Sequence, residues 1–454
     1  MLDLGHTGIA LIRSNGEELS YAALREAVRI RAAEFRASGA AAGTCVALAL
    51  PDPSAFLVDA LAVWETGAAV LPIDVRAGTR WVDDLVSRGG AAILVTPDSI
   101  STRPGRAIDP RCALLLFTSG STGKPKGVLL SRAGLSANLD AILAYLPIAA
   151  SPRTALVLPL NYSYALVGQA LTTLRAGGTL LLLGDLIYPA LQLEAMARLE
   201  ASGLSSVPTS LRLLSRAAAA GSAKPRLGYV ASAGAPLDQA TAAEVRAAFP
   251  GIHLFNQYGL TEASPRVAAI SDQDADFVRG AVGRPLAGIE AWACGEDGAR
   301  LPAGEPGEIV VRGPSVMLGY LDDAKATARV LTNGALRTGD AGRVDARGCL
   351  WIEGRKDGVV KCAGERVSLD EVAAALRAHA GVAEACVLAI PDEALGARLI
   401  AFVEASASLV PTLRLYLRDE LPPAKRPSRI LALAALPRTA NGKVDLRALQ
   451  ETLR

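Results

Sequence analysis

The sequence has few of the features that mark secreted, metal-binding or nucleic-acid-binding proteins. Its six cysteines include no CxxC pair, and their spacing relative to the three histidines does not resemble a set of metal ligands. We therefore expect free thiols in a reducing compartment rather than disulfides or a zinc site. The net charge is only +2, and no basic run contains interleaved aromatic residues. Nucleic acid is consequently a poor candidate for the main partner.

Membrane signals are also scarce. Residues 1–20, "MLDLGHTGIALIRSNGEELS", lack a basic stretch followed by a hydrophobic core, so no signal peptide is expected. Residues 154–174 form an uncharged run long enough to span a bilayer, but a proline and several polar residues interrupt it. A buried strand followed by a buried helix explains this run better. We expect a cytoplasmic protein with no membrane partner.

The sequence is rich in apolar residues. It has 454 residues, of which 51% are hydrophobic and 20% charged, so two or three well-buried domains are expected. The first 100 residues alternate short apolar strands with amphipathic helices. One such helix follows Ser20, a plausible N-cap, and ends near Gly39. This alternation predicts an α/β fold of parallel-type sheets covered by helices.

The amino-acid composition changes in the second half of the chain. Residues 285–313 are dense in glycine and proline between short strands, which predicts a β subdomain. We place a domain boundary after residue 354, giving an N-terminal domain (1–354) and a small α+β C-terminal domain (355–454). In the latter, Ser368 and Glu371 are spaced as a capping box for a helix.

A polar loop follows an apolar strand at residues 117–127, "FTSGSTGKPKG". A P-loop would need serine or threonine after Lys124, where Pro125 stands. A nucleophile elbow would need glycine at the position of Ser119. What remains is a loop of amides, hydroxyls and two lysines that suits a polyphosphate, with a surface hairpin as the alternative.

Further motifs follow this loop in a fixed order: "NQYGLTEAS" (256–264), "LRTGDAGRVDARGCLWIEGRKD" (336–357), "VVKCAGERVSLDEV" (359–372) and "PRTANGKVDLRAL" (437–449). With the loop, they closely resemble the adenylate-forming (ANL) superfamily of acyl- and aryl-CoA synthetases, peptide-synthetase adenylation domains and luciferases. The resemblance covers essentially the whole chain. It implies a large adenylating domain and a small mobile C-terminal domain.

The resemblance also implies an ATP site. It assigns ATP binding to Thr118, Ser119, Gly120, Ser121, Thr122, Gly123, Lys124, Lys126, Gly234, Ala235, Pro236, Asn256, Tyr258, Gly259, Asp340 and Arg355. Tyr258 would lie against adenine, while Asp340 would hold the ribose hydroxyls. Thr261 would bind the α-phosphate, and Glu262 would ligate Mg²⁺, which takes oxygen ligands.

Lys443 is the residue that the resemblance places at the reacting atoms. It would bridge the attacking carboxylate and the α-phosphate, where negative charge accumulates. A charge pair about 4 Å apart at an effective dielectric constant of 20 is worth roughly 4 kcal/mol. That energy is equivalent to about three orders of magnitude in rate. For the later thioester step, the family pattern assigns a hinge to Asp357 and the opposite domain face to Lys361 and Gly364.

The acid pocket departs from the family pattern. Tyr162 stands where many acyl-CoA synthetases have a histidine, and no acidic residue lies between Thr154 and Gly184 to bind a substrate amine. Alignment indicates a pocket lined by Tyr162, Tyr164, Gly168 and Val207, although simple core packing is a rival explanation. We therefore expect an aryl or aliphatic acid as substrate rather than an α-amino acid.

Taken together, the resemblance implies activation of a small carboxylic acid with ATP and Mg²⁺, giving an acyl-adenylate and pyrophosphate. The acyl group would pass to coenzyme A or to the phosphopantetheine arm of a separate acyl or peptidyl carrier protein. The alternatives are a stand-alone amino-acid adenylation enzyme, a catalytically silent nucleotide-binding homologue and a luciferase-like oxygenase.

Overall fold

The computed structural model describes residues 4–76, 78–118, 125–184, 188–355, 359–437 and 444–453. The chain forms two compact units, which are treated separately below. The larger unit contains Met1–Ile73, Arg88–Leu116 and Gly127–Lys356, and the smaller one contains Asp74–Ser87, Phe117–Lys126 and Asp357–Arg454.

A nine-stranded sheet is the largest element of the first unit. Its strands, in spatial order, are β15 (Arg284–Pro285), β14 (Ala268–Ser271), β13 (His253–Tyr258), β12 (Tyr229–Ser232), β11 (Gly203–Ser206), β9 (Arg153–Leu156), β10 (Thr179–Leu182), β1 (Ile9–Arg13) and β2 (Glu18–Ser20). The strands from β13 to β1 run parallel, whereas β14 and β2 pair with their neighbours antiparallel. The predicted parallel-type sheet is confirmed.

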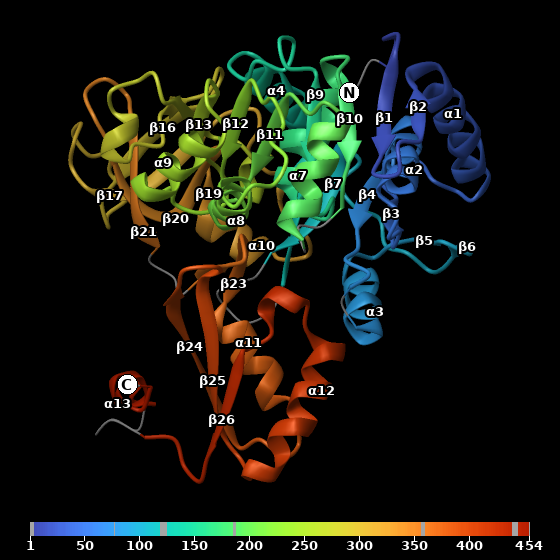
Figure 1. Ribbon diagram of the computed structural model, residues 1–454. Helices are drawn as coiled ribbons and strands as arrows, with labels where there is room; N and C mark the ends of the chain where they lie inside the picture. Colours follow the sequence, from blue (N-terminus) through green and yellow to red (C-terminus); the bar gives the residue numbers. More distant parts are fainter. Residues whose placement is uncertain are drawn as a thin grey trace. The chain divides into compact units, whose positions relative to one another are not determined.

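Helices cover both faces of this sheet. Helices α7 (Pro189–Arg198), α8 (Pro208–Ala219) and α9 (Gln239–Ala248) bury leucine, valine and methionine side chains against one face (Figure 1). The opposite face packs on α4 (Arg132–Leu143) through Ala141 and Ile142.

The uncharged run at 154–174 contributes β9 and then a buried helical segment, as predicted. This segment is divided into α5 (Ser163–Ala165), a π-helix η1 (Leu166–Leu171) and α6 (Thr172–Arg175). The π-helix was not predicted, and such irregular turns are frequent at functional sites. Within the described ranges, no helix combines the length and apolarity needed to cross a membrane.

A seven-stranded sheet carries the polar loop. Its order is β18 (Gly319–Tyr320), β8 (Lys126–Ser131), β7 (Cys112–Thr118), β4 (Ala69–Pro72), β3 (Cys45–Leu48), β5 (Ile93–Thr96) and β6 (Ser99–Thr102). Helices α1 (Tyr21–Ala37) and α2 (Pro53–Thr66) bury their apolar sides in the same core as β3 and β4. The predicted N-cap is confirmed, because Ser20 Oγ accepts from the Ala23 amide at 3.1 Å.

The predicted β subdomain is confirmed as a separate antiparallel sheet. It contains β16 (Glu290–Cys294), β17 (Gly307–Arg312), β20 (Ala335–Val344), β19 (Leu331–Thr332) and β21 (Leu350–Arg355). Helix α10 (Ala324–Val330) precedes β19. In the β20–β21 ladder, Asp340 lies directly opposite Arg355.

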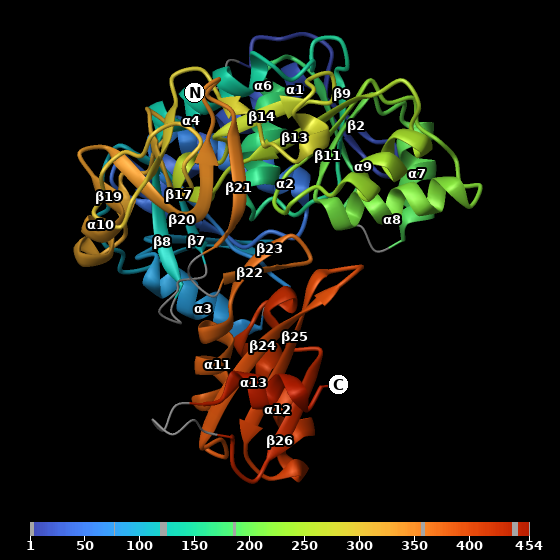
Figure 2. The ribbon, with the colours of Figure 1, turned by 90° about the vertical axis from the view of Figure 1, so that its left-hand side faces the viewer.

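The smaller unit has its own hydrophobic core. Figure 2 shows its sheet of β24, β25 and β26 together with α11 and α12. The described elements of this unit are α3 (Thr79–Arg88, of which all but Arg88 belongs to this unit), the hairpin β22 (Val359–Cys362) and β23 (Glu365–Ser368), the sheet β24 (Glu384–Asp392), β25 (Gly396–Glu404) and β26 (Arg429–Leu433), and helices α11 (Leu369–Arg377), α12 (Val410–Glu420) and α13 (Leu446–Glu451).

Only half of the predicted capping box forms in α11. Ser368 Oγ accepts from the Glu371 amide at 3.3 Å, as expected. The Glu371 side chain does not return the bond, because its Oε1 accepts from buried Lys425 Nζ at 2.5 Å. Its Oε2 has no partner within the described part of the chain. The spacing predicted that the Glu371 carboxylate would cap the helix, but this carboxylate pairs with buried Lys425 instead.

All six cysteines are free thiols, and Cys45 and Cys112 are fully enclosed in the apolar core. Burial raises the pKa of the Cys112 thiol to about 12, so it stays protonated and unreactive. The predicted free thiols are confirmed; five of the six are buried, and Cys386 is partly exposed.

Candidate active site

Tyr258 and Asp340, which are far apart in sequence, meet in the larger unit. The Tyr258 hydroxyl donates to Asp340 Oδ2 at 2.6 Å, and both residues are buried. Tyr258 ends β13 of the nine-stranded sheet, whereas Asp340 lies in β20 of the β subdomain. Two residues that the sequence assigned to one nucleotide therefore share one hydrogen bond.

Hydrogen bonds between side chains and the backbone fix the part of β20 that carries Asp340. The Asp340 amide donates to Thr338 Oγ1 at 3.1 Å, and Thr338 Oγ1 donates to the Ile309 carbonyl at 2.8 Å. The Gly339 amide donates to Glu308 Oε1 at 3.1 Å. These bonds hold the carboxylate at a defined position before any ligand arrives.

Glu262 and Thr261 lie directly after β13, in the short 3-10 helix η2 (Thr261–Ala263). The buried Glu262 carboxylate accepts from the Tyr320 hydroxyl at 3.2 Å, and its carbonyl accepts from the Met317 amide at 2.9 Å. The hydroxyls of Thr261 and Ser163 are 3.1 Å apart and share a hydrogen bond. A hydroxyl and a carboxylate are thus presented side by side at the end of a buried strand.

The segment predicted to line adenine follows the neighbouring parallel strand. Gly234, Ala235 and Pro236 come just after β12, in which Ser232 is paired with Asn256 of β13. Gly234 adopts a positive φ of 86°, which glycine allows without strain. Ligands of open α/β sheets bind beside the carboxyl ends of such strands.

Two further residues of the motif have structural contacts. Asn256 Nδ2 donates to the Ala281 carbonyl at 3.0 Å. A Cβ on Gly259 would lie 1.8 Å from the Pro265 carbonyl oxygen, so only glycine fits there. Gly259 therefore permits the close packing before Thr261 and Glu262, whereas Asn256 ties β13 to the segment around Ala281.

The residues predicted for the acid pocket gather on the helical segment after β9 and at the start of α8. The Tyr164 hydroxyl donates to the carbonyls of Ala231 (3.2 Å) and Ser206 (3.4 Å). Burial raises the pKa of Tyr164 well above its usual range, so the phenol is neutral. Gly168 lies in the π-helix, and Val207 is the N-cap residue of α8.

The sequence analysis missed Arg266, the largest fully buried side chain in the described chain. Its guanidinium lies over the Tyr164 ring at 4.6 Å, and its backbone exchanges hydrogen bonds with the Asn138 side chain. An arginine within the apolar stretch after the "LTEAS" motif was the available signal. Ser163 and Tyr320, which bond Thr261 and Glu262, were missed as well and carry no sequence signal of their own.

Several predicted residues lie outside the described ranges: Ser119, Gly120, Ser121, Thr122, Gly123, Lys124, Asp357 and Lys443. Thr118 ends β7 and Lys126 begins β8, the strands that flank the loop. For Arg355 the structure gives the backbone position opposite Asp340. Lys361 lies in β22, and Gly364 occupies the turn to β23 with a φ of 86°.

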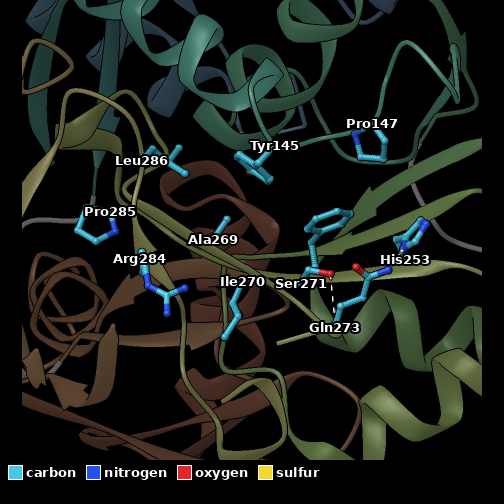
Figure 3. Close-up of a pocket in the computed structure, with 11 residues that line it drawn as sticks. Tyr145, Pro147, His253, Ala269, Ile270, Ser271, Gln273, Arg284, Pro285 and Leu286 are labelled. Atoms are coloured by element: carbon cyan, nitrogen blue, oxygen red, sulfur yellow. Dashed lines mark hydrogen bonds between the residues drawn. The ribbon is translucent and has the colours of Figure 1, made fainter. Parts of the chain in front are cut away.

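A pocket of about 530 Å³ opens elsewhere in the larger unit, and none of the predicted site residues lines it (Figure 3). Its walls are Tyr145, Pro147, His253, Phe255, Ala269, Ile270, Ser271, Gln273, Arg284, Pro285 and Leu286. Gln257 Nε2 donates to the Tyr145 hydroxyl at 2.7 Å behind this wall.

Family models match most of the chain. The model of the AMP-binding enzymes matches residues 6–112 and 102–321, and that of the AMP-binding enzyme C-terminal domain matches residues 371–443. The chain therefore belongs to the AMP-binding enzymes, the adenylate-forming superfamily. It is an acid–thiol ligase of the AMP-forming type, which activates an acid by adenylation.

Individual relatives cover nearly the same length. A feruloyl-CoA synthase of Amycolatopsis sp is 30% identical, over 95% of this chain and 94% of its own. An L-proline–[L-prolyl-carrier protein] ligase of Pseudomonas fluorescens is 33% identical, over 81% of this chain and 74% of its own. The structure of the amide bond synthetase McbA from Marinactinospora thermotolerans matches with a TM-score of 0.86 and 28% identity, over 99% of this chain and 98% of the other.

Proposed function

We propose that this ligase joins a non-amino carboxylic acid to AMP at the site around Tyr258, Thr261, Glu262 and Asp340. A carboxylate oxygen of the substrate attacks the α-phosphorus of ATP, and pyrophosphate leaves with the electron pair of the broken P–O bond. A thiol then attacks the acyl carbonyl, and AMP leaves. The observation that carries the proposal is the buried hydrogen bond between Tyr258 and Asp340.

This hydrogen bond supports a nucleotide role for both residues. The Asp340 carboxylate has two oxygens with several lone pairs, so it can accept from Tyr258 and still hold ribose hydroxyls. The Tyr258 ring, fixed through its hydroxyl, presents a flat face for adenine. Gly234, Ala235 and Pro236 follow the adjacent strand and supply the opposite wall.

Thr261 and Glu262 act on the phosphates in this proposal. The Thr261 hydroxyl, held by Ser163, donates to an oxygen of the α-phosphate. Glu262 fits a magnesium site, because its buried carboxylate supplies the oxygen ligands that Mg²⁺ prefers, and Tyr320 orients it. When bound there, Mg²⁺ neutralises phosphate charge.

Lys443 and the phosphate loop complete the proposed machinery. The lysine ammonium pairs with the oxygen that joins the acid to the α-phosphate, where charge develops. Residues 118–126 receive the departing pyrophosphate through backbone amides and lysines.

The acid enters beside Tyr162, Tyr164, Gly168 and Val207. No carboxylate occurs between residues 154 and 184, so an α-ammonium group would be buried there uncompensated, at a cost of several kcal/mol. An aryl or aliphatic acid avoids this cost. Coenzyme A or a carrier-protein phosphopantetheine then accepts the acyl group.

Exchange of radiolabelled pyrophosphate into ATP tests the proposal directly. Exchange should require Mg²⁺ and one of a panel of aryl, aliphatic and amino acids, and Asp340→Ala should remove it. Glu290→Ala is the matched control, because Glu290 carries a carboxylate on β16 of the same sheet and pairs with exposed Arg300. Absence of exchange with the whole panel, from a folded protein that binds ATP, would favour a silent nucleotide-binding homologue.

A further inference from the structure

Arg266 is a buried cation that forms no ion pair with any of the residues that the structure describes. Only 2% of the residue is exposed, although arginine is almost never fully buried unless paired. Its Nε and Nη2 are enclosed and have no hydrogen-bond partner among the residues that the structure describes. The Tyr164 ring and the Tyr145 hydroxyl interact with this guanidinium, but neither supplies a negative charge against its large desolvation cost.

The two unpartnered nitrogens are the pair that binds an anion best. Nε and Nη2 share one edge of the planar guanidinium, and their N–H bonds point the same way. This edge matches the two oxygens of a carboxylate or sulfonate in a bidentate arrangement. Tyr164 covers the flat face of the guanidinium at 4.6 Å, and Asn138 uses only backbone atoms of Arg266. The Tyr145 side chain also interacts with the guanidinium, but Nε and Nη2 have no partner among the described residues.

The neighbouring tyrosines cannot supply the missing negative charge. Burial raises the pKa of both Tyr145 and Tyr164 despite the opposing effect of Arg266. Both phenols therefore stay neutral at physiological pH. The anion must come from outside the described residues.

Arg266 lies in the predicted acid pocket. A Cβ on Gly168 would come within 2.9 Å of Nη2 and 3.1 Å of the Tyr164 ring, so the absence of a side chain at Gly168 is what admits the guanidinium beside this segment. The Tyr162 hydroxyl, from the same helical segment, is also buried without a partner among the described residues. The helical segment also contacts the chain just before Arg266, where Ser163 shares a hydrogen bond with Thr261.

We propose that Arg266 recognises a second anionic group on the acid, a carboxylate or sulfonate at the end remote from the carboxylate that is adenylated. This inference rests on the proposed function and narrows its substrate class. The reacting carboxylate lies at Thr261 while the remote anion pairs with the Nε–Nη2 edge. Because this edge is removed from solvent, the interaction is stronger than at a surface.

Matched pairs of acids test the proposal in pyrophosphate exchange. Each pair exchanges an anionic group for a methyl group: succinic against butanoic acid, terephthalic against 4-methylbenzoic acid, and 4-sulfobenzoic against 4-methylbenzoic acid. The wild-type enzyme should prefer the doubly anionic member of at least one pair by tenfold or more in kcat/KM. Preference for the methyl member in every pair would overturn the proposal.

Variants separate recognition from packing. Arg266→Gln should raise the KM of the doubly anionic acid by about 30-fold or more and abolish the preference, with the KM of ATP unchanged. Arg266→Lys should retain part of the preference for the doubly anionic acid, because lysine keeps the charge but lacks the paired donors of arginine. Gly168→Ala, which crowds Nη2, should weaken the preference without removing the arginine.

Arg246→Gln is the matched control. Arg246 also lies over an aromatic ring, that of Phe277 at 5.1 Å, but it already pairs with Asp272 at 3.1 Å. The Arg246→Gln variant should leave the preference between the two acids of each pair unchanged. Equal loss of activity toward both members of each pair in Arg266→Gln would mean that Arg266 only packs, and would reject its role in recognition.

Direct measurement of acid binding separates this inference from the proposed function. If no acid supports exchange, the proposed function fails, and calorimetric titration of the same acids still tests Arg266. Tighter binding of a doubly anionic acid that disappears in Arg266→Gln would support the anion site, and equal binding to both proteins would reject it.

Discussion

The hydroxyl of Tyr258 donates to the carboxylate of Asp340 at 2.6 Å, and this bond joins a strand of the nine-stranded sheet to a strand of the β subdomain. The two residues are 82 positions apart in sequence. Because the bond involves a charged acceptor, it is worth about 1.5–3 kcal/mol. It orients the carboxylate that we assign to the ribose.

Tyr258→Phe should therefore weaken ATP binding without removing it. The ring remains available to adenine, but Asp340 loses its fixed donor. We expect the KM of ATP in pyrophosphate exchange to rise about 10-fold, the lower end of the energy of such a bond. The KM of the acid should not change, and an unchanged KM of ATP would show that the bond does not prepare the ribose site.

Thr261→Val should lower the rate of exchange more than it raises either KM. The substitution keeps the shape but removes the hydroxyl that Ser163 holds at 3.1 Å. Loss of one oriented donor to developing charge costs about 10²-fold or more in kcat. Ser163→Ala provides the comparison: it should have a smaller effect, because it only releases the orientation of Thr261. Equal effects of the two variants would place Thr261 outside the reaction.

Lys443 and Gly364 should separate the two half-reactions. Lys443→Ala should lose pyrophosphate exchange but still transfer the acyl group from a supplied acyl-adenylate to a thiol. Gly364→Leu should keep exchange and lose transfer, because a side chain there would occupy the path of the pantetheine arm.

The turn at Gly364 calls for a specific control. Its φ of 86° strains most side chains, so Gly364→Leu alone does not separate steric blocking from distortion of the turn. Asparagine tolerates positive φ and is similar in size to leucine, so Gly364→Asn should also lose transfer. Normal transfer in Gly364→Asn, or loss of both half-reactions in both variants, would reject the alternation between steps.

The buried ion pair between Lys425 and Glu371 should matter for stability. The two side chains are almost fully enclosed, with Nζ and Oε1 at 2.5 Å. Lys425→Met should reduce the free energy of unfolding by about 3–5 kcal/mol, because it leaves an uncompensated buried carboxylate. The double variant Lys425→Met, Glu371→Leu should recover most of this loss. Urea denaturation followed by circular dichroism measures both, and a double variant no more stable than the single one would contradict the explanation.

Local sequence determined the elements and their order. Apolar runs with turn residues gave the strands, the N-cap at Ser20 was correct, and the glycine- and proline-rich stretch gave the β subdomain. The motif residues followed from short-range pattern and family resemblance. These features depend on neighbours in the chain, so a sequence can specify them directly.

Tertiary structure alone decided which distant side chains meet. Glu371 pairs with Lys425 instead of capping the helix, because a buried ammonium needs a negatively charged partner more than a neutral amide does. Tyr258 of β13 bonds Asp340 of β20, and Arg266 lies against both Tyr164 and Gly168. Burial, charge pairing and the lack of a hydrogen-bond partner arise only when separate segments pack together. The pattern of neighbouring residues in the sequence therefore cannot predict them.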